Sequence, residues 1–213
     1  MLPAANDEHT SEHFTMVFVP ERSVEGRSLM SDDSDEQLLA RLRHSDEVAF
    51  ETLFTRYYSQ IYRVLYRLTG TREAAEDLAQ ETFLTLYDNP PRLAAGTSLV
   101  AWLCRVALNR GYNALRGERR AAQRVEQTAE SPSESDPQAE ALRAEERARV
   151  RAILQRLPER QSKLLLLRHA GLAYAEIAAV LDVAPGSIGT LLARAERAFI
   201  VAYQQHEPID REV

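Results

Sequence analysis

Apolar residues recur at three- and four-residue spacing along most of this chain, which is the period of an amphipathic helix. The clearest case is a stretch of about twenty residues whose apolar members are Phe50, Leu53, Phe54, Tyr57, Ile61, Val64, Leu65 and Leu68. An unbroken stripe of this length predicts a long helix with one face in a core. The strand-like segment Thr15–Pro20 has no second strand to pair with, so no strand is expected in the folded parts.

Capping and breaking residues divide the first half into helices. Ser34 followed by Gln37 has the spacing of a capping box, and Ser45 is the expected cap of the long helix. Gly70 is expected to end that helix and Thr71 to cap the next one. Paired prolines make DNPPRLAAGT a loop, after which Thr97 or Ser98 starts a helix that reaches about Val125.

The second half begins with an acidic segment rich in Ser and Pro, EQTAESPSESDPQAE, that cannot form a core. After it we expect a helix to Arg156, a helix from Pro158 to Gly171, a short one over Tyr174–Leu181 and a last one over Pro185–Tyr203. The fold class is therefore all-α, with two small helical domains on a flexible acidic linker. The predicted divisions are an N-terminal extension at 1–33, domains at 34–125 and 141–205, the linker at 126–140 and a tail at 206–213.

The extension at 1–33 is polar and acidic, which predicts disorder or a translation start at Met30. The net charge of the chain is −6, but residues 1–34 and 126–140 together hold −10. The folded parts, residues 35–125 and 141–213, carry +2 each. Because local charge governs contact with nucleic acid, the acidic total does not argue against DNA binding.

Two helices in the first domain carry faces of contrasting chemistry. At 100° per residue, Asp77, Gln80, Glu81 and Leu84 share one side of a helix, opposite an apolar set. The next helix places Arg105, Asn109, Tyr112, Asn113, Arg116 and Arg120 on one face. Carboxylates and an amide suit a protein partner, whereas Arg, Asn and Tyr suit phosphates and bases.

These helices, with the motifs EDLAQETFLTLY and SLVAWLCRVALNRGYNALRGERR, resemble region 2 of bacterial sigma factors of the extracytoplasmic-function type. The segment LPERQSKLLLLRHAGLAYAEIAAVLDVAPGSIGTLLARAERAF resembles their region 4, a helix-turn-helix. The two regions cover about two-thirds of the chain in the family's order. The resemblance implies a cytoplasmic transcription-initiation factor that is not an enzyme and needs no cofactor or metal, with core RNA polymerase, promoter DNA and an anti-sigma factor as partners.

The resemblance also assigns roles to residues. Asp77, Gln80, Glu81 and Leu84 would dock on the coiled coil of the largest polymerase subunit. Residues 89–98 and the following helix would bind the minus-ten element, through Trp102, Arg105, Asn109, Tyr112, Asn113, Arg116, Arg119 and Arg120. The minus-thirty-five element would contact Arg160, Lys163, Arg168, Ser187, Thr190 and Arg194.

The second helix of the helix-turn-helix departs from the family pattern. Its sequence, PGSIGTLLARAE, has Gly189, Leu191, Ala193 and Glu196 where polar or basic residues are common. The usual Ser or Thr caps are replaced by Ala173 and Ala184. Fewer phosphate contacts predict weaker and less salt-sensitive minus-thirty-five binding.

Two other functions remain as alternatives: a helix-turn-helix regulator that never docks on polymerase, and an inactive sigma paralogue that sequesters an anti-sigma factor. The first leaves the Asp77 face unexplained, and the second follows from the weakened recognition helix. His9, Glu12 and His13 match a zinc-protease spacing, but a polar tail offers no rigid helix to hold a metal. Cys104 is the single cysteine, so it has no partner for a disulfide and is expected in the core. The sequence has no apolar run long enough to predict a membrane-spanning helix.

Overall fold

The polypeptide folds entirely into helices over the part of the chain that the structure describes. This computed structural model describes residues 33–93, 98–122 and 137–205, and these ranges contain no strand. The predicted all-α fold class is therefore confirmed. Residues 1–32 of the extension, residues 126–136 of the linker, the tail, and the motif with His9 and His13 lie outside the described residues.

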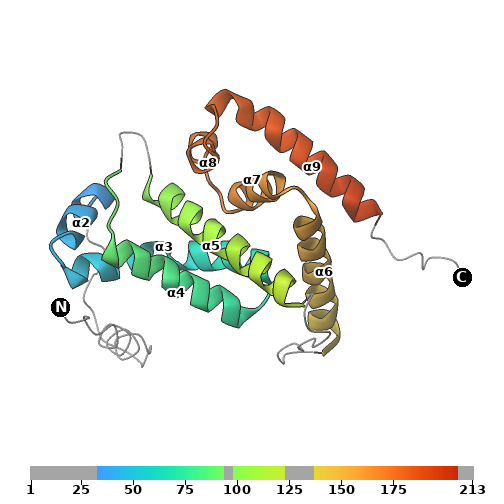
Figure 1. Cartoon of the computed structure of the whole chain (residues 1–213), viewed down its shortest axis with the longest axis horizontal. Helices are drawn as coiled ribbons and strands as arrows, with labels where there is room; N and C mark the ends of the chain where they lie inside the picture. The colour runs from blue at the N-terminus through green and yellow to red at the C-terminus, as the bar shows by residue number, and fades with distance from the viewer. Residues whose placement is uncertain (1–32, 94–97, 123–136, 206–213) are drawn as a thin grey trace, which may run out of the picture. The chain divides into compact units, whose positions relative to one another are not determined.

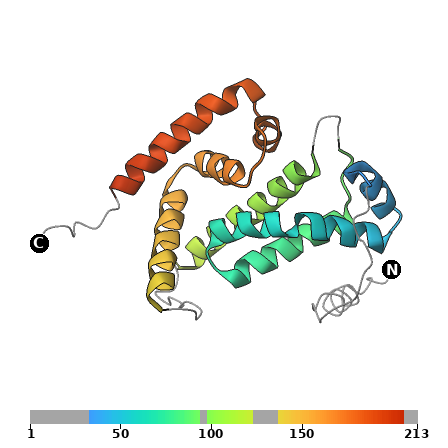
Figure 2. The same ribbon diagram turned by 180° about the vertical axis from the view of Figure 1, so that it is seen from behind.

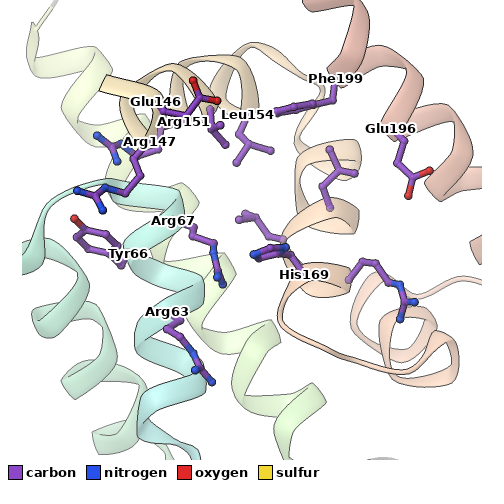
Figure 3. A pocket seen from close by; sticks show the side chains of 14 residues that line it. Arg63, Tyr66, Arg67, Glu146, Arg147, Arg151, Leu154, His169, Glu196 and Phe199 are labelled. Atoms are coloured by element: carbon purple, nitrogen blue, oxygen red, sulfur yellow. The ribbon is translucent and has the colours of Figure 1, made fainter. Parts of the chain in front are cut away.

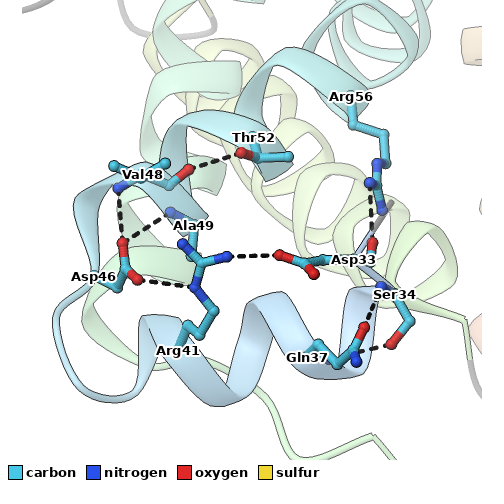
Figure 4. Close-up of polar contacts among 9 residues, drawn as sticks. All are labelled: Asp33, Ser34, Gln37, Arg41, Asp46, Val48, Ala49, Thr52 and Arg56. Carbon is cyan, nitrogen blue, oxygen red and sulfur yellow. Dashed lines mark hydrogen bonds and ion pairs between the residues drawn. The ribbon is translucent and has the colours of Figure 1, made fainter. Parts of the chain in front are cut away.

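The first described helix, α2 (Asp35–Leu42), begins with the predicted capping box. The Ser34 backbone N–H donates to Oε1 of Gln37 at 2.8 Å, and the Gln37 N–H donates to Oγ of Ser34 at 3.3 Å. Two of the four unpaired N–H groups at this helix end are thereby satisfied. Arg41, in the last turn of α2, pairs with Asp33 at 2.6 Å (Figure 4).

Helix α3 (Glu47–Thr69) is capped by Asp46, so the prediction of Ser45 as its cap is wrong. Ser45 has a φ of 60°, whereas an N-cap residue needs an extended backbone. One oxygen of Asp46 accepts from the first backbone N–H groups of α3, and the other pairs with Arg41 at 2.9 Å (Figure 4). The hydrogen bond from Arg41 lowers the pKa of Asp46, and the bonds from the helix lower it further.

Three helices, α3, α4 (Arg72–Asp88) and α5 (Leu99–Ala122), lie side by side and enclose the first part of the core (Figures 1 and 2). Its fully buried side chains include Leu53, Leu65, Phe83, Leu103 and Leu108. Each such side chain contributes about 1.5–3 kcal/mol of transfer free energy, so the predicted apolar stripes hold this group together. Gly70, with a φ of 90°, ends α3, and Thr71 caps α4 as predicted. The Oγ of Ser98 accepts from the third residue of its helix and marks the start of α5.

The second group begins with α6 (Pro137–Arg156), which starts inside the segment predicted as linker. The predicted boundary at residue 140 is therefore too late, because Pro137 fits the first turn of a helix, where its missing N–H costs nothing. Helix α7 spans Glu159–His169, and α8 spans Tyr174–Leu181 as predicted. A short 3-10 turn, η1 (Pro185–Ser187), leads into α9 (Ile188–Gln204).

Helices α8 and α9 form the predicted helix-turn-helix. The segment from η1 through α9 is bent by 106° from α8, within the usual range for this motif. Ile177, Ile188, Leu192 and Ala195 are buried between the two helices and α7. Among the described residues, no single helix is long and apolar enough to cross a membrane, although α8 and η1–α9 together meet that criterion by length and composition.

The two helical groups pack against each other, which the tethered-domain prediction did not anticipate. Helix α5 contacts α8, and α3 contacts both α6 and α7. The side-chain amide of Gln60 in α3 donates to the carbonyl of Ala170, just after α7, at 2.9 Å. Cys104 of α5 is buried as predicted, and this burial raises the pKa of its thiol to about 12.

Two glycines of α5 are expected to respond oppositely to alanine. A Cβ at Gly111 would lie 2.6 Å from Cδ2 of buried Leu68 in α3, whereas Gly117 has nothing within 4 Å of the same position. Gly117→Ala should raise the free energy of unfolding by about 0.5–1 kcal/mol through helix propensity. Gly111→Ala should lower it by about 1 kcal/mol, because overpacking outweighs that gain. Urea denaturation of both variants checks this, and equal stabilisation by the two would contradict the close approach of α3 and α5.

Candidate polymerase- and promoter-binding surfaces

The acidic face of α4, formed by Asp77, Gln80, Glu81 and Leu84, is presented outward from the first core. Asp77, Gln80 and Glu81 are exposed, and Leu84 is partly buried. The opposite side of the helix, with Ala79, Phe83 and Leu86, is fully buried. This face is therefore held rigidly by the core behind it, with Asp77, Gln80 and Glu81 exposed at the surface.

Arg110 of α5 links this acidic face to the neighbouring helix. Its guanidinium pairs with Glu81 at 2.6 Å and donates to Oγ1 of Thr85 at 2.8 Å. The sequence places Arg110 toward the apolar side of α5, away from the predicted DNA contacts. In the structure it is half-buried and holds the side chain of Glu81 in place.

The basic face of α5, formed by Arg105, Asn109, Asn113, Arg116 and Arg120, is exposed along the helix. The structure does not place Tyr112 with them, because that side chain is only 9 % exposed and packs in the core. Trp102 is partly buried against the same core. The side chain of Arg119 lies outside the described residues.

Helices of the second group contact the basic face of α5 at several points. Arg105 donates to the carbonyls of Ala179 and Val180 in the last turn of α8, the latter at 3.2 Å. Arg116 pairs with Glu159 of α7 at 2.7 Å, and Nζ of Lys163 donates to Oδ1 of Asn109 at 3.2 Å. Residues predicted to bind the minus-ten element are thus occupied by contacts within the chain. We refer to the bonds that Arg105, Asn109 and Arg116 make with α7 and α8 as the α5–α7/α8 contact.

Glu159 supplies the carboxylate that pairs with two cations of the α5–α7/α8 contact. It accepts from Arg116 on one side and pairs with Lys163 at 2.8 Å on the other. Burial alone would raise the pKa of Glu159, but the two cations outweigh burial and hold the pKa below its ordinary value. Because the pKa of Glu159 is lowered in the folded protein, its ion pairs stabilise the α5–α7/α8 contact at pH values above the ordinary carboxyl pKa. This stabilisation is lost as the pH falls through the lowered pKa and Glu159 becomes protonated.

The residues predicted to bind the minus-thirty-five element lie in two environments. Thr190 and Arg194 are exposed on α9, and Arg160 is exposed on α7. Arg168 is also exposed, with its guanidinium 5.5 Å from the ring centroid of Tyr174. The remaining two are engaged: Ser187 is partly buried and donates to the Ala184 carbonyl at 2.7 Å, and Lys163 is held by Glu159 and Asn109.

Comparisons with known proteins agree with this geometry. The model for Sigma-70 region 2 matches residues 53–121, and the model for Sigma-70 region 4 matches residues 147–199. The RNA polymerase sigma-H factor of Pseudomonas aeruginosa is 30 % identical over 187 residues, which cover 83 % of this chain and 97 % of that protein. The chain belongs to the sigma-70 family of RNA polymerase sigma factors.

Other relatives place this sigma factor in the extracytoplasmic-function type. The sigma factor SigM of Mycobacterium tuberculosis, which is of that type, is 28 % identical over 76 % of this chain and 81 % of its own. A solved structure of the sigma factor RpoE in complex with the anti-sigma factor NepR, from Bartonella quintana, has the same fold. It superposes with a TM-score of 0.52 at 22 % identity, over 76 % of this chain and 98 % of that one. The sigma factor thus acts in transcription initiation, as the sequence motifs predicted.

Two residues of the sigma factor's surfaces were not found from the sequence. Glu159 was not singled out, although its spacing of four residues from Lys163 indicates an ion pair on one helix face. Arg110 lies toward the apolar side of α5 in the sequence pattern, which argues against a DNA contact and indicates no other role. No local pattern indicates its pairing with Glu81, which lies 29 residues earlier in the chain.

A hydroxyl at position 173 should stabilise the helix-turn-helix of the sigma factor. Ala173 occupies the N-cap of α8 in an extended conformation, and its N–H already donates to Glu176 at 2.7 Å. Ala173→Ser would complete the capping box and should raise the free energy of unfolding by about 1 kcal/mol. Ala175→Ser, inside the first turn, is the control and should give no gain. Thermal melts followed by circular dichroism measure both, and a loss of stability in Ala173→Ser would contradict the capping geometry.

Proposed function

We propose that this sigma factor binds core RNA polymerase through the acidic face of α4. The observation that carries the proposal is that Asp77 and Gln80 are exposed on a helix whose other side is fully buried, within the segment matched as Sigma-70 region 2. A polar face on a rigid helix offers hydrogen-bond acceptors and donors with little loss of conformational freedom on binding. Arg110 holds Glu81 in place beside them.

We further propose that the basic face of α5 binds the minus-ten element. Arg105, Arg116, Arg119 and Arg120 would neutralise phosphates, while Asn109 and Asn113 would hydrogen-bond to unpaired bases. Trp102 is the aromatic side chain that fits a stacking role, because it keeps part of its surface exposed. Tyr112 supports the helix from within the core instead of offering a ring face.

The helix-turn-helix would bind the minus-thirty-five element through α9. Thr190 and Arg194 are exposed on the helix that enters the major groove in this motif, and Arg160 and Arg168 flank it with positive charge. The exposed part of α9 has few cations, which supports weaker and less salt-dependent binding than a typical region 4 provides. Ser187 and Lys163 would contribute only after release from their present partners.

Promoter binding requires the α5–α7/α8 contact to separate. Arg105, Asn109 and Arg116 already bond to α7 and α8 through side-chain nitrogen and oxygen atoms that the proposed DNA contacts would need. We therefore propose that this arrangement is a closed form and that docking on polymerase opens it. An anti-sigma factor is a proposed partner that would hold the chain away from polymerase, as the complex of RpoE with NepR suggests. The chain itself would carry out no catalysis, would need no cofactor and would act in the cytoplasm.

Run-off transcription with core polymerase and the DNA upstream of the chain's own gene tests the proposed function. The unchanged protein should give a specific transcript. Asp77→Ala with Gln80→Ala should lose both core binding and the transcript, because the docking face is removed. Asn109→Ala with Arg116→Ala should keep core binding but lose the transcript, because only promoter contacts are removed.

Core binding is measured separately by co-elution of the two proteins on gel filtration. Glu51→Ala with Ser59→Ala is the control, since these exposed side chains of α3 lie outside the acidic face of α4, the basic face of α5 and the helix-turn-helix. Core binding that survives the Asp77 and Gln80 changes would contradict the docking face. If the unchanged protein binds core polymerase but gives no transcript from any promoter tested, the result would instead favour the sequestering paralogue.

A further inference from the structure

A cavity of about 890 Å³ lies where α3 meets α6, α7 and α9 (Figure 3). Its lining includes no residue of the acidic face of α4 or the basic face of α5, and it shares only Arg168 with the proposed minus-thirty-five surface. Its size falls within the usual range for sites that take small molecules. The cavity therefore needs an explanation of its own.

The lining of this cavity is strongly basic. Five arginines and one histidine contribute to it against two glutamates. These basic side chains come from three helices: Arg63 and Arg67 from α3, Arg147 and Arg151 from α6, and Arg168 and His169 from α7. One of the two glutamates, Glu146, accepts a hydrogen bond from the hydroxyl of Tyr203. Side chains on both helical groups thus bring positive charge into one space.

Repulsion between basic side chains of α3 and α7 helps to lower the pKa values of Arg67 and His169. Burial lowers the pKa of Arg67, and repulsion by Arg63, one helical turn away, lowers it further. Burial also lowers the pKa of His169, with added repulsion from Arg67. Within the described ranges, Arg63, Arg67 and Arg151 form no ion pair. Like charges held close together in excess of the nearby carboxylates are unfavourable, and an anion in the cavity would reduce that penalty.

The rest of the lining is apolar and aromatic. Val150, Leu154, Leu165 and Leu166 contribute aliphatic surface, and Phe199 contributes a ring. Tyr66 lies among the arginines (Figure 3). Its ring also stacks on Tyr62, with ring centroids 5.9 Å apart. A simple inorganic anion would leave this surface unused, whereas a planar ring attached to phosphates would use both parts.

We propose that this cavity binds a nucleoside polyphosphate. Guanidinium groups bind phosphate oxygens through paired hydrogen bonds, and the apolar and aromatic wall receives the base. Because α3 belongs to one helical group and α6, α7 and α9 to the other, the bound ligand contacts both. Binding therefore stabilises the closed form described above. The binding site itself does not depend on the proposed function, since it involves none of the promoter-binding or polymerase-binding residues except Arg168.

Isothermal titration calorimetry of the full chain with ATP, in buffer without phosphate, tests the proposal. ATP should bind at one site, and tripolyphosphate should bind more weakly because it lacks the base. Arg63→Gln with Arg67→Gln should weaken ATP binding by at least about tenfold. Arg151→Gln, on the opposite wall, should weaken it in the same direction. Melting temperatures without ligand show that the variants remain folded.

Arg43→Gln with Arg197→Gln is the matched control, because it removes the same charge from exposed positions outside the cavity. These changes should leave ATP binding as it is. Equal weakening by the control and by the Arg63 and Arg67 changes would overturn the site, since it would show binding to positive charge in general. Equal affinity for ATP and tripolyphosphate would overturn the nucleoside, and no binding of either at millimolar concentration would overturn the proposal as a whole.

Discussion

The arrangement of this sigma factor depends on helix α5, which serves two kinds of partner at once. Its apolar side fills the core between α3 and α4, and its basic face meets α7 and α8. Arg105 bonds to the carbonyl end of α8, where the helix dipole favours a cation. The same face is the one that the sequence assigns to promoter DNA. Under the proposed function, a single helix surface would therefore make either the contacts within the chain or the contacts with nucleic acid.

The energies of these contacts suit a reversible arrangement. The Arg116–Glu159 pair is about half exposed on the Arg116 side, at 48 %, and exposed ion pairs contribute only about 0.2–1 kcal/mol each. Hydrogen bonds from a charged group such as Arg105 contribute about 1.5–3 kcal/mol. A closed form held by a few such contacts is one that partners offering similar charged contacts would be able to open. Electrostatic contacts of this kind also weaken with salt.

Most of the helices could be predicted from the sequence because capping residues and apolar spacing act locally. The Ser34–Gln37 box and Gly70 involve residues within a few positions of one another, and α8 was predicted to the residue. The predicted N-cap of α3 was wrong because Ser45 and Asp46 are both good capping residues. The pairing of Asp46 with Arg41 decides between them. The contact of α5 with α8 was not predictable, because it joins residues 74 and 75 positions apart and involves backbone carbonyls, which carry no sequence signal. The burial of Tyr112 follows from the same packing, since Lys163 of α7 lies 5.1 Å from its ring centroid.

The separation of the two helical groups can be measured directly by electron spin resonance. Spin labels at Thr55→Cys in α3 and Ile200→Cys in α9 lie on exposed positions, and buried Cys104 with its raised pKa should not react with the label. The free protein should show one narrow distance distribution, which should move to longer distances when core polymerase and promoter DNA are added. The same short distance in a complex that actively transcribes would contradict the claim that promoter binding requires α5 to leave α7 and α8.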